Sequence, residues 1–410
     1  MAIQGPAVED YLSVGLAEEI TAALACLRWI FVVDSGSLAA AVERDGQEAA
    51  GRALGLDFLL AGTLQRSGAR LRVSLRLTDL RPPAGVVWTQ RFEREADDLM
   101  ALQDEVAAAV VARIDPEILL IEASRAGSRP AIGASAYELL LRAIPAIHRL
   151  DRAGFLAAGD WLREATTREP DYAPALAWHA YWHVFMLGQG WAADWSAGVP
   201  QGVSQSGPDE RPKGSASDDR EAAAMAAAER LASRAIALDP LDAQGLTILG
   251  HVPAFVHHRV EEAAALHRRA LALNPNLAMA WVFLGMAESY LGDHAAGLLR
   301  LDRYRALAPC HPHAFFFDAA RAVPLLLLGR HAEAAEVCRA AIALQPGFSF
   351  PQKVLLAALG HLGEPAEAVR ARLLAIEPGF TVQQALQRTP LRLAADRAHY
   401  GKGLRLGGLG

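Results

Sequence analysis

The chain has 410 residues, with 40 basic and 46 acidic side chains and therefore a formal net charge of −6. Hydrophobic residues make up 52% of it and charged residues 21%, a composition that excludes an intrinsically disordered chain. Neither the first 125 residues nor the remainder carries a basic excess, so we expect no direct binding of nucleic acid.

The first 122 residues mix helical and strand patterns. Apolar residues alternate with polar ones over 71–78, which is typical of a half-exposed strand and places Arg70, Arg72 and Arg76 on its solvated face. The other expected elements are helices at 16–27, 37–54 (capped by Ser37) and 97–114, and strands at 30–33, 58–64 and 86–92. This order predicts a small α/β domain.

From about residue 135 onward the strand pattern gives way to a repeat. Apolar helical segments end at a proline six times, with steps of 70, 35, 34, 37 and 32 residues between the prolines Pro170, Pro240, Pro275, Pro309, Pro346 and Pro378. The longest step equals one unit of about 34 residues plus an insertion. That insertion lies at 188–217, which is rich in Gly, Ser and Pro and is expected to be a flexible loop.

The unit that ends at Pro309 contains the residue types that mark a known helical repeat. Trp281, Leu284–Gly285 and Gly292 stand where the tetratricopeptide repeat has its Trp, its Leu-Gly pair and its inter-helix Gly, and the unit resembles that repeat. Glu288 and Gly297 depart from that pattern, since the family has Tyr and Ala there. Two further prolines, Pro253 and Pro324, fall inside expected first helices and predict kinked or shortened helices. Helix pairs of this kind bury their apolar faces by stacking on one another.

Four sequence blocks in the first region follow one another in the same order as in a known domain family. They are 15–20, 28–33, 53–64 and 88–105, and together they resemble the TolB-amino-terminal-like (FlgO-like) domain. The resemblance implies a place between an output domain and tetratricopeptide repeats, as in bacterial winged-helix transcription regulators and class III adenylate/guanylate cyclases. Met1–Tyr11 lacks the family's first strand and its Leu-Pro-Phe-like turn. We therefore expect a start-truncated regulator, with a strand edge near 30–33 left open for self-association or a partner.

Neither a membrane span nor a disulfide framework is predicted. No apolar run reaches the roughly 18 residues that cross a bilayer, and Met1–Tyr11 lacks the features of a signal peptide. The three cysteines, Cys26, Cys310 and Cys338, are scattered, which indicates a reducing, cytoplasmic compartment. Cys26 and Cys338 lie on apolar helical patterns and are expected in the core.

Histidine pairs give only weak signals for a metal. His179 and His183 are four residues apart on an expected helix, a spacing that allows a shared metal ion. However, no Glu follows His179, and no third ligand is evident, so we expect no metal there. We likewise expect no metal at the pairs His257–His258 and His311–His313. We also find no catalytic motif, and Gly401–Lys402–Gly403 is expected to belong to a frayed tail.

Four tryptophans gather around the start of the insertion: Trp178, Trp182, Trp191 and Trp195. One interpretation is a hydrophobic plug inside the first repeats. The other is an aromatic pocket for a ligand or peptide, because Trp and Tyr dominate binding hot spots. The sequence leaves both open.

The sequence therefore predicts a small α/β domain (1–122), a linker (123–134), an all-α tetratricopeptide-like superhelical solenoid (135–390) and a C-terminal tail (391–410). We expect a non-enzymatic regulatory or scaffold protein in bacterial signalling or transcription control, without cofactor or metal. It would bind a protein or peptide in the repeat groove. The expected partner-binding residues are Trp178, Tyr181, Trp182, His251, Met279 and Met286. The alternatives are the regulatory fragment of a class III cyclase or DNA-binding regulator, and a stand-alone enzyme using the Trp/His cluster.

Overall fold

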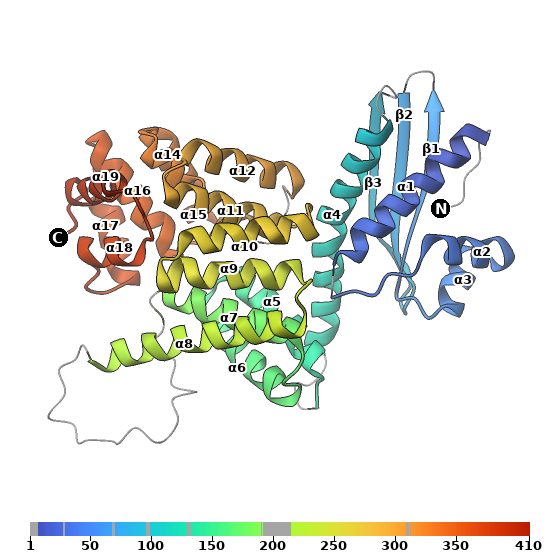
Figure 1. Cartoon of the computed structure of the whole chain (residues 1–410), viewed down its shortest axis with the longest axis horizontal. Helices are drawn as coiled ribbons and strands as arrows, with labels where there is room; N and C mark the ends of the chain where they lie inside the picture. Colours follow the sequence, from blue (N-terminus) through green and yellow to red (C-terminus); the bar gives the residue numbers. More distant parts are fainter. Residues whose placement is uncertain are drawn as a thin grey trace. The chain divides into compact units, whose positions relative to one another are not determined.

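The structure is a computed structural model that describes residues 7–27, 29–67, 70–95, 99–128, 133–189, 191, 215–308, 311 and 313–410. The chain forms two compact units, Met1–Ile121 and Glu122–Gly410 (Figure 1). The first mixes helices with a sheet, and the second is all helical. None of the described helices is both long and apolar enough to cross a membrane.

The first unit is built on a three-stranded antiparallel sheet in the order β1-β2-β3. Its register pairs Leu60 with Leu77 and Val73 with Phe92. The elements are α1 (Ala7–Ala25), α2 (Ser35–Asp45), α3 (Gln47–Ala53), β1 (Phe58–Ser67), β2 (Arg70–Asp79), β3 (Gly85–Glu95) and α4 (Leu99–Gly127).

The predicted alternation in β2 is present and defines the core of this unit. Leu71, Val73, Leu75 and Leu77 are buried and face the apolar sides of α1 and α4. Burying each such side chain contributes about 1.5–3 kcal/mol. Arginines on the other face of β2 are exposed, and the Nε of Arg72 donates to Glu93 at 2.8 Å. That face is thus a solvated, ion-paired strand surface.

The prediction of a buried strand at 30–33 was wrong. These residues form no strand and lie outside the sheet, and Phe31 is 92% exposed. A short apolar run becomes a strand only if a neighbouring strand pairs with it, and the described sheet ends at β1. The next helix is capped by Asp34, which accepts from the N–H of Ser37, so Ser37 is not the cap. Gly46, with φ +80°, separates α2 from α3.

The second unit is a stack of helix pairs, which makes the chain a small α/β unit followed by an all-α tetratricopeptide-like solenoid, as predicted. The pairs are α5 (Ala136–Arg149) with α6 (Arg152–Arg168), α7 (Ala173–Gly188) with α8 (Ser215–Leu238), α9 (Ala243–His257) with α10 (Val260–Leu273), α11 (Ala278–Leu291) with α12 (His294–Leu307), α13 (Ala314–Ala319) and α14 (Ala322–Leu327) with α15 (His331–Leu344), and α16 (Ser349–Leu362) with α17 (Glu367–Ile376).

Local sequence explains where these helices begin and end. Asp151, Asp242 and Asp293 cap α6, α9 and α12 by accepting hydrogen bonds from backbone N–H groups in the first turn. The second helices stop just before the predicted prolines, as α6 does at Pro170. Pro324 accompanies a broken first helix, because that repeat has α13 and α14 in place of one long helix.

The departure from the family pattern at Gly297 also has a structural reason. A Cβ at Gly297 would lie 2.1 Å from the Oγ of Ser289 and 2.6 Å from the carbonyl oxygen of Gly285. The backbones of α11 and α12 therefore approach too closely at this point for Ala. Glycine allows the close crossing that Ala gives elsewhere in the solenoid.

Two predicted boundaries were wrong. The expected linker at 123–134 is helical up to Gly127, because α4 extends into it. The expected tail at 391–410 is part of the helical unit, since α18 (Val382–Arg388) is followed by α19 (Ala394–Leu406), which packs on α16. A Cβ at Gly360 would lie 2.1 Å from the carbonyl oxygen of Gly403. The glycines that suggested a frayed tail thus permit close helix packing.

Candidate functional site: the aromatic interior and its cavity

The first helices of the repeats are buried on all sides. In α11, for example, the residues from Ala278 to Tyr290 are buried with the single exception of Trp281. The same holds for almost all of α7 and α16. A helix that is apolar all round belongs inside a protein. The inner side of this solenoid is therefore a packed interior.

Aromatic rings from successive first helices fill this interior. Phe185 of α7 lies 4.7 Å from Phe316 of α13, between ring centroids. His251 of α9 stacks on Phe283 of α11 at 4.1 Å. Tilted and edge-on arrangements at these distances contribute about 0.5–1.5 kcal/mol each beyond the burial of area. The rings thus hold four repeats together from within.

Contacts between distant repeats close the interior. The Nε2 of Gln345 donates to the carbonyl oxygen of Arg149 at 2.5 Å, across 196 residues of sequence. The backbone N–H of Ser349 reaches the Oε1 of Gln189 at 3.4 Å, and His148 of α5 stacks on His313 at 5.0 Å. The first repeat therefore touches later ones, and the helices wrap around a common core.

The residues predicted to bind a partner all lie inside this core. None of their side chains is more than 6% exposed: Trp178, Tyr181, Trp182, His251, Met279 and Met286. Trp182 is representative, because its Nε1 donates to the carbonyl oxygen of Phe155 at 2.6 Å and its ring packs against Gly159. Trp191 lies in the same cluster, 5.3 Å from Phe155, and Trp195 lies outside the described residues. In the part of the chain that the structure describes, these buried positions fit a hydrophobic plug inside the first repeats.

A cavity remains at one end of the interior, with a volume of ≈ 280 Å³. It is close to the smallest of the volumes typical of small-molecule sites, which are about 300–1,000 Å³. Of the predicted residues only His251 lines it. Most of its wall is apolar, and the chief contributors are Phe185, Phe255, Phe316, Phe348, Val354 and Tyr400.

Charged groups meet in the wall of this cavity. The Nζ of Lys353 lies 2.5 Å from Glu377, and Arg388 bridges Glu377 at 3.2 Å to Glu221 at 3.1 Å. Burial lowers the pKa of Lys353, although the carboxylate of Glu377 opposes that shift. Arg388 thereby ties α18 to α8, two helices that are far apart in the sequence. The cavity thus combines an apolar body with one polar corner, the arrangement found in ligand sites.

The buried histidines of the interior are neutral. Burial lowers the pKa of His179 and His267 to about 3 and that of His183 and His311 to about 4. His179 and His183 stack at 4.9 Å, and the described residues supply no third ligand beside them. This pair is therefore part of the packing of α7.

Two features of this unit escaped the sequence analysis. Lys353 is one of only three lysines and lies inside an apolar helix, which was a usable signal for a buried ion pair. His331, His361 and His399 are separated by 30 and 38 residues, which match no ligand spacing, yet they lie together in the fold. Of the predicted core cysteines, Cys338 is buried and Cys26 is half-exposed.

Comparisons with known proteins give partial similarities. No family model matches the chain. The putative adenylate cyclase 3 of Rhizobium meliloti (strain 1021) is 28% identical over 204 residues, which are 50% of this chain and 34% of that protein. The chain thus matches about a third of that relative's length.

The similar solved structures include two tetratricopeptide proteins. A thermophilic one from Thermus thermophilus, TTC0263, is 17% identical, with a TM-score of 0.38, over 55% of this chain and 99% of that one. YrrB, described as having an unusual peptide-binding site, is 14% identical, with a TM-score of 0.29, over 53% of this chain and 93% of that one.

Proposed function

We propose that this protein is a non-enzymatic regulatory module whose helical unit binds a small amphipathic ligand in the cavity beside Lys353 and Arg388. The observation that supports it is the cavity itself, an apolar space with one polar corner inside an otherwise packed interior. Aliphatic or aromatic groups of the ligand would replace solvent against the phenylalanine rings. A polar end would reach the charged groups.

A compact ligand suits this geometry better than an extended peptide. A peptide lying along the inner helices would have to displace rings such as Phe283 and Tyr181, which already pack on one another. The energy of that packing would be lost for every repeat that opened. A protein partner remains compatible with the cavity only if it inserts a short apolar segment at the mouth.

The charged side chains in the cavity wall offer a way for the ligand to act on the protein. Arg388 holds Glu221 of α8 and Glu377 near α18 at the same time. A ligand whose polar end competes for Arg388 would weaken the link between those helices. Binding would then shift the position of α8 relative to α18, which is the kind of two-state element that regulation needs.

Calorimetric titration with octanol and octanoate tests the proposal, because the two probes share an apolar body and differ in the charge of the polar end. Met225 of α8 lines the cavity and is half-exposed, so Met225→Trp should fill the mouth without unfolding the chain. Ala226→Trp, on the exposed side of the same helix, is the matched control. We expect saturable binding that Met225→Trp abolishes and Ala226→Trp preserves. Equal binding by both variants, or no binding by the wild type, would refute the cavity as the site.

A second proposal concerns the biological setting. We infer that the chain is the regulatory part of a cytoplasmic signalling protein, with the TolB-amino-terminal-like region next to an output domain such as a class III cyclase. The matched relative named as a putative adenylate cyclase supports this inference. Sequencing the coding DNA upstream of Met1 tests it. An in-frame cyclase or winged-helix domain is the expected result, and an unrelated gene ending before Met1 would count against it.

A further inference from the structure

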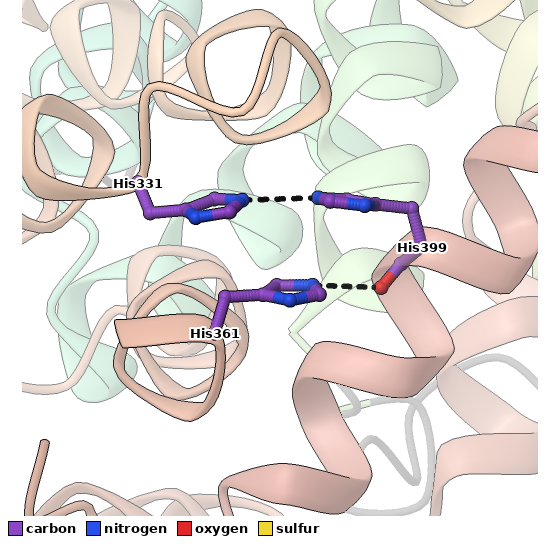
Figure 2. A group of neighbouring side chains, drawn as sticks. All are labelled: His331, His361 and His399. Atoms are coloured by element: carbon purple, nitrogen blue, oxygen red, sulfur yellow. Dashed lines mark hydrogen bonds between the residues drawn. The ribbon is translucent and has the colours of Figure 1, made fainter. Parts of the chain in front are cut away.

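Three histidines from three helices meet near the C-terminal end of the helical unit (Figure 2). His331 is the first residue of α15, His361 lies in the last turn of α16, and His399 lies within α19. One ring nitrogen of each lies within 4.8 Å of the others. All three side chains are half-exposed, so an ion has a route to them from solvent.

The rings of His331 and His399 face each other through their Nε2 atoms. These atoms are 3.1 Å apart, a hydrogen bond in which one ring donates and the other accepts. Two imidazole ligands at about 2.0–2.1 Å from a tetrahedral ion are separated by about 3.3 Å. The observed spacing is therefore close to that across a metal. A cation between the rings would take the place of this hydrogen bond, with the proton of the donor ring carried on its Nδ1 instead of its Nε2.

The third ring, that of His361, stacks on the other two. His361 stacks 4.1 Å from His399 and 4.5 Å from His331, between ring centroids. Its Nε2 donates to the backbone carbonyl of His399 at 3.0 Å, and the ring of His399 also hydrogen-bonds the backbone at Leu326. Hydrogen bonds of ligand imidazoles to backbone carbonyls are the usual way in which proteins fix the tautomer and orientation of metal-binding histidines.

We propose that His331, His361 and His399 form a binding site for Zn²⁺ or a similar borderline divalent cation. Imidazole is a preferred ligand of such ions, and three histidines leave a fourth position open to water or an added ligand. The ligands lie on helices, which position them more firmly than loops would. Asp396, one turn before His399, offsets part of the positive charge that Lys402 brings to the site.

An ion at this site would fasten α19 to α15 and α16. The three ligands come from segments 30 and 38 residues apart, so the unfolded chain would hold no such site. Metal binding would then be coupled to the docking of the last helix. None of the three histidines lines the proposed ligand cavity, so Zn²⁺ binding can be measured without the cavity ligand.

Titration of the tag-free full chain with ZnCl₂ after chelator treatment tests the proposal. We expect one ion per chain and a higher unfolding temperature with Zn²⁺. His331→Gln, His361→Gln and His399→Gln should each weaken binding by at least about 100-fold. His257→Gln is the control, because this exposed histidine lies on α9 and pairs with Glu229. X-ray absorption should detect nitrogen ligands at about 2.0–2.1 Å.

Two results would overturn the proposal. One is wild-type protein with no saturable Zn²⁺ binding below about 1 mM. The other is that the variants of His331, His361 and His399 keep the native circular dichroism spectrum and bind Zn²⁺ as tightly as His257→Gln does. All three side chains are half-exposed, so their replacement should leave the fold intact. If one variant nevertheless unfolds, the other two test the proposal.

Discussion

Replacing Trp182 with Ala distinguishes a packed interior from an open aromatic groove. The indole of Trp182 is fully buried, stacks on Phe155 at 5.6 Å and donates its Nε1 proton to the carbonyl oxygen of that residue. Substitutions of this kind cost about 3–5 kcal/mol when the surroundings cannot collapse. In a groove that is open to solvent the same change would cost little.

The matched control is Trp281→Ala. Trp281 is half-exposed and also donates to a backbone carbonyl, that of Pro275 at 2.8 Å. It loses one hydrogen bond and partial packing, and we expect a cost of about 1 kcal/mol. Urea unfolding monitored by circular dichroism at pH 7.5 gives both free energies. A cost for Trp182→Ala no larger than that for Trp281→Ala would refute the packed interior.

Gly159 extends the test to a double-mutant cycle. A Cβ at Gly159 would lie 2.3 Å from the ring of Trp182, so Gly159→Ala should destabilise the wild type. In the Trp182→Ala background the ring is gone, and Ala stabilises a helix relative to Gly by about 0.5–1 kcal/mol. The sign of the Gly159→Ala effect should therefore reverse. Additive effects would mean that the ring does not occupy this place.

Two other predictions follow from burial and close approach. Burial holds the pKa of His179 and His267 at about 3 and that of His183 and His311 at about 4, whereas the unfolded chain takes up protons near pH 6.5. Stability should thus be full above pH 6.5 and fall between pH 6.5 and 4, by up to about 1.4 kcal/mol per pH unit for each histidine; equal urea midpoints at pH 7.5 and 5.5 would contradict this. Gly360→Ala should loosen α19, because its Cβ would lie 2.1 Å from the carbonyl oxygen of Gly403. Faster hydrogen exchange in α19 is the expected readout, and Gly347→Ala, where nothing lies within 4 Å, should leave it unchanged.

Local patterns in the sequence were sufficient for the order of elements. The alternation around Val73 reports burial on one side of a strand, and the recurring prolines, such as Pro275, mark the ends of second helices. Both signals depend on residues that are close in sequence. The α/β unit and the repeated helix pairs could therefore be predicted before the structure was known.

Features that depend on distant contacts could not be predicted. The closure of the interior depends on pairs such as Gln345 with Arg149, which are far apart in the chain. The stretch at 30–33 was predicted as a strand from its apolar residues alone. Local pattern cannot show whether a neighbouring strand is there to pair with it. Likewise Gly403 signals a loop in sequence, and only its distance to Gly360 shows that it serves packing.

The histidine triad shows the same limit at a candidate site. His331 and His361 occupy the start and end of neighbouring helices, and α19 brings His399 to them from what sequence alone indicated to be a tail. The separations of the three histidines in the sequence match no known spacing of metal ligands. The cavity shows the same limit, since Lys353 and Arg388 are brought together by Glu377, which pairs with both.

The heat-capacity change of octanol binding tests the central claim most directly. Titrations at several temperatures, with wild type and with Met225→Trp and Ala226→Trp, measure whether apolar surface is buried in this cavity. We predict saturable binding with a negative heat-capacity change in the wild type and in Ala226→Trp, and no binding in Met225→Trp. Binding that survives Met225→Trp with the same heat-capacity change would contradict the account.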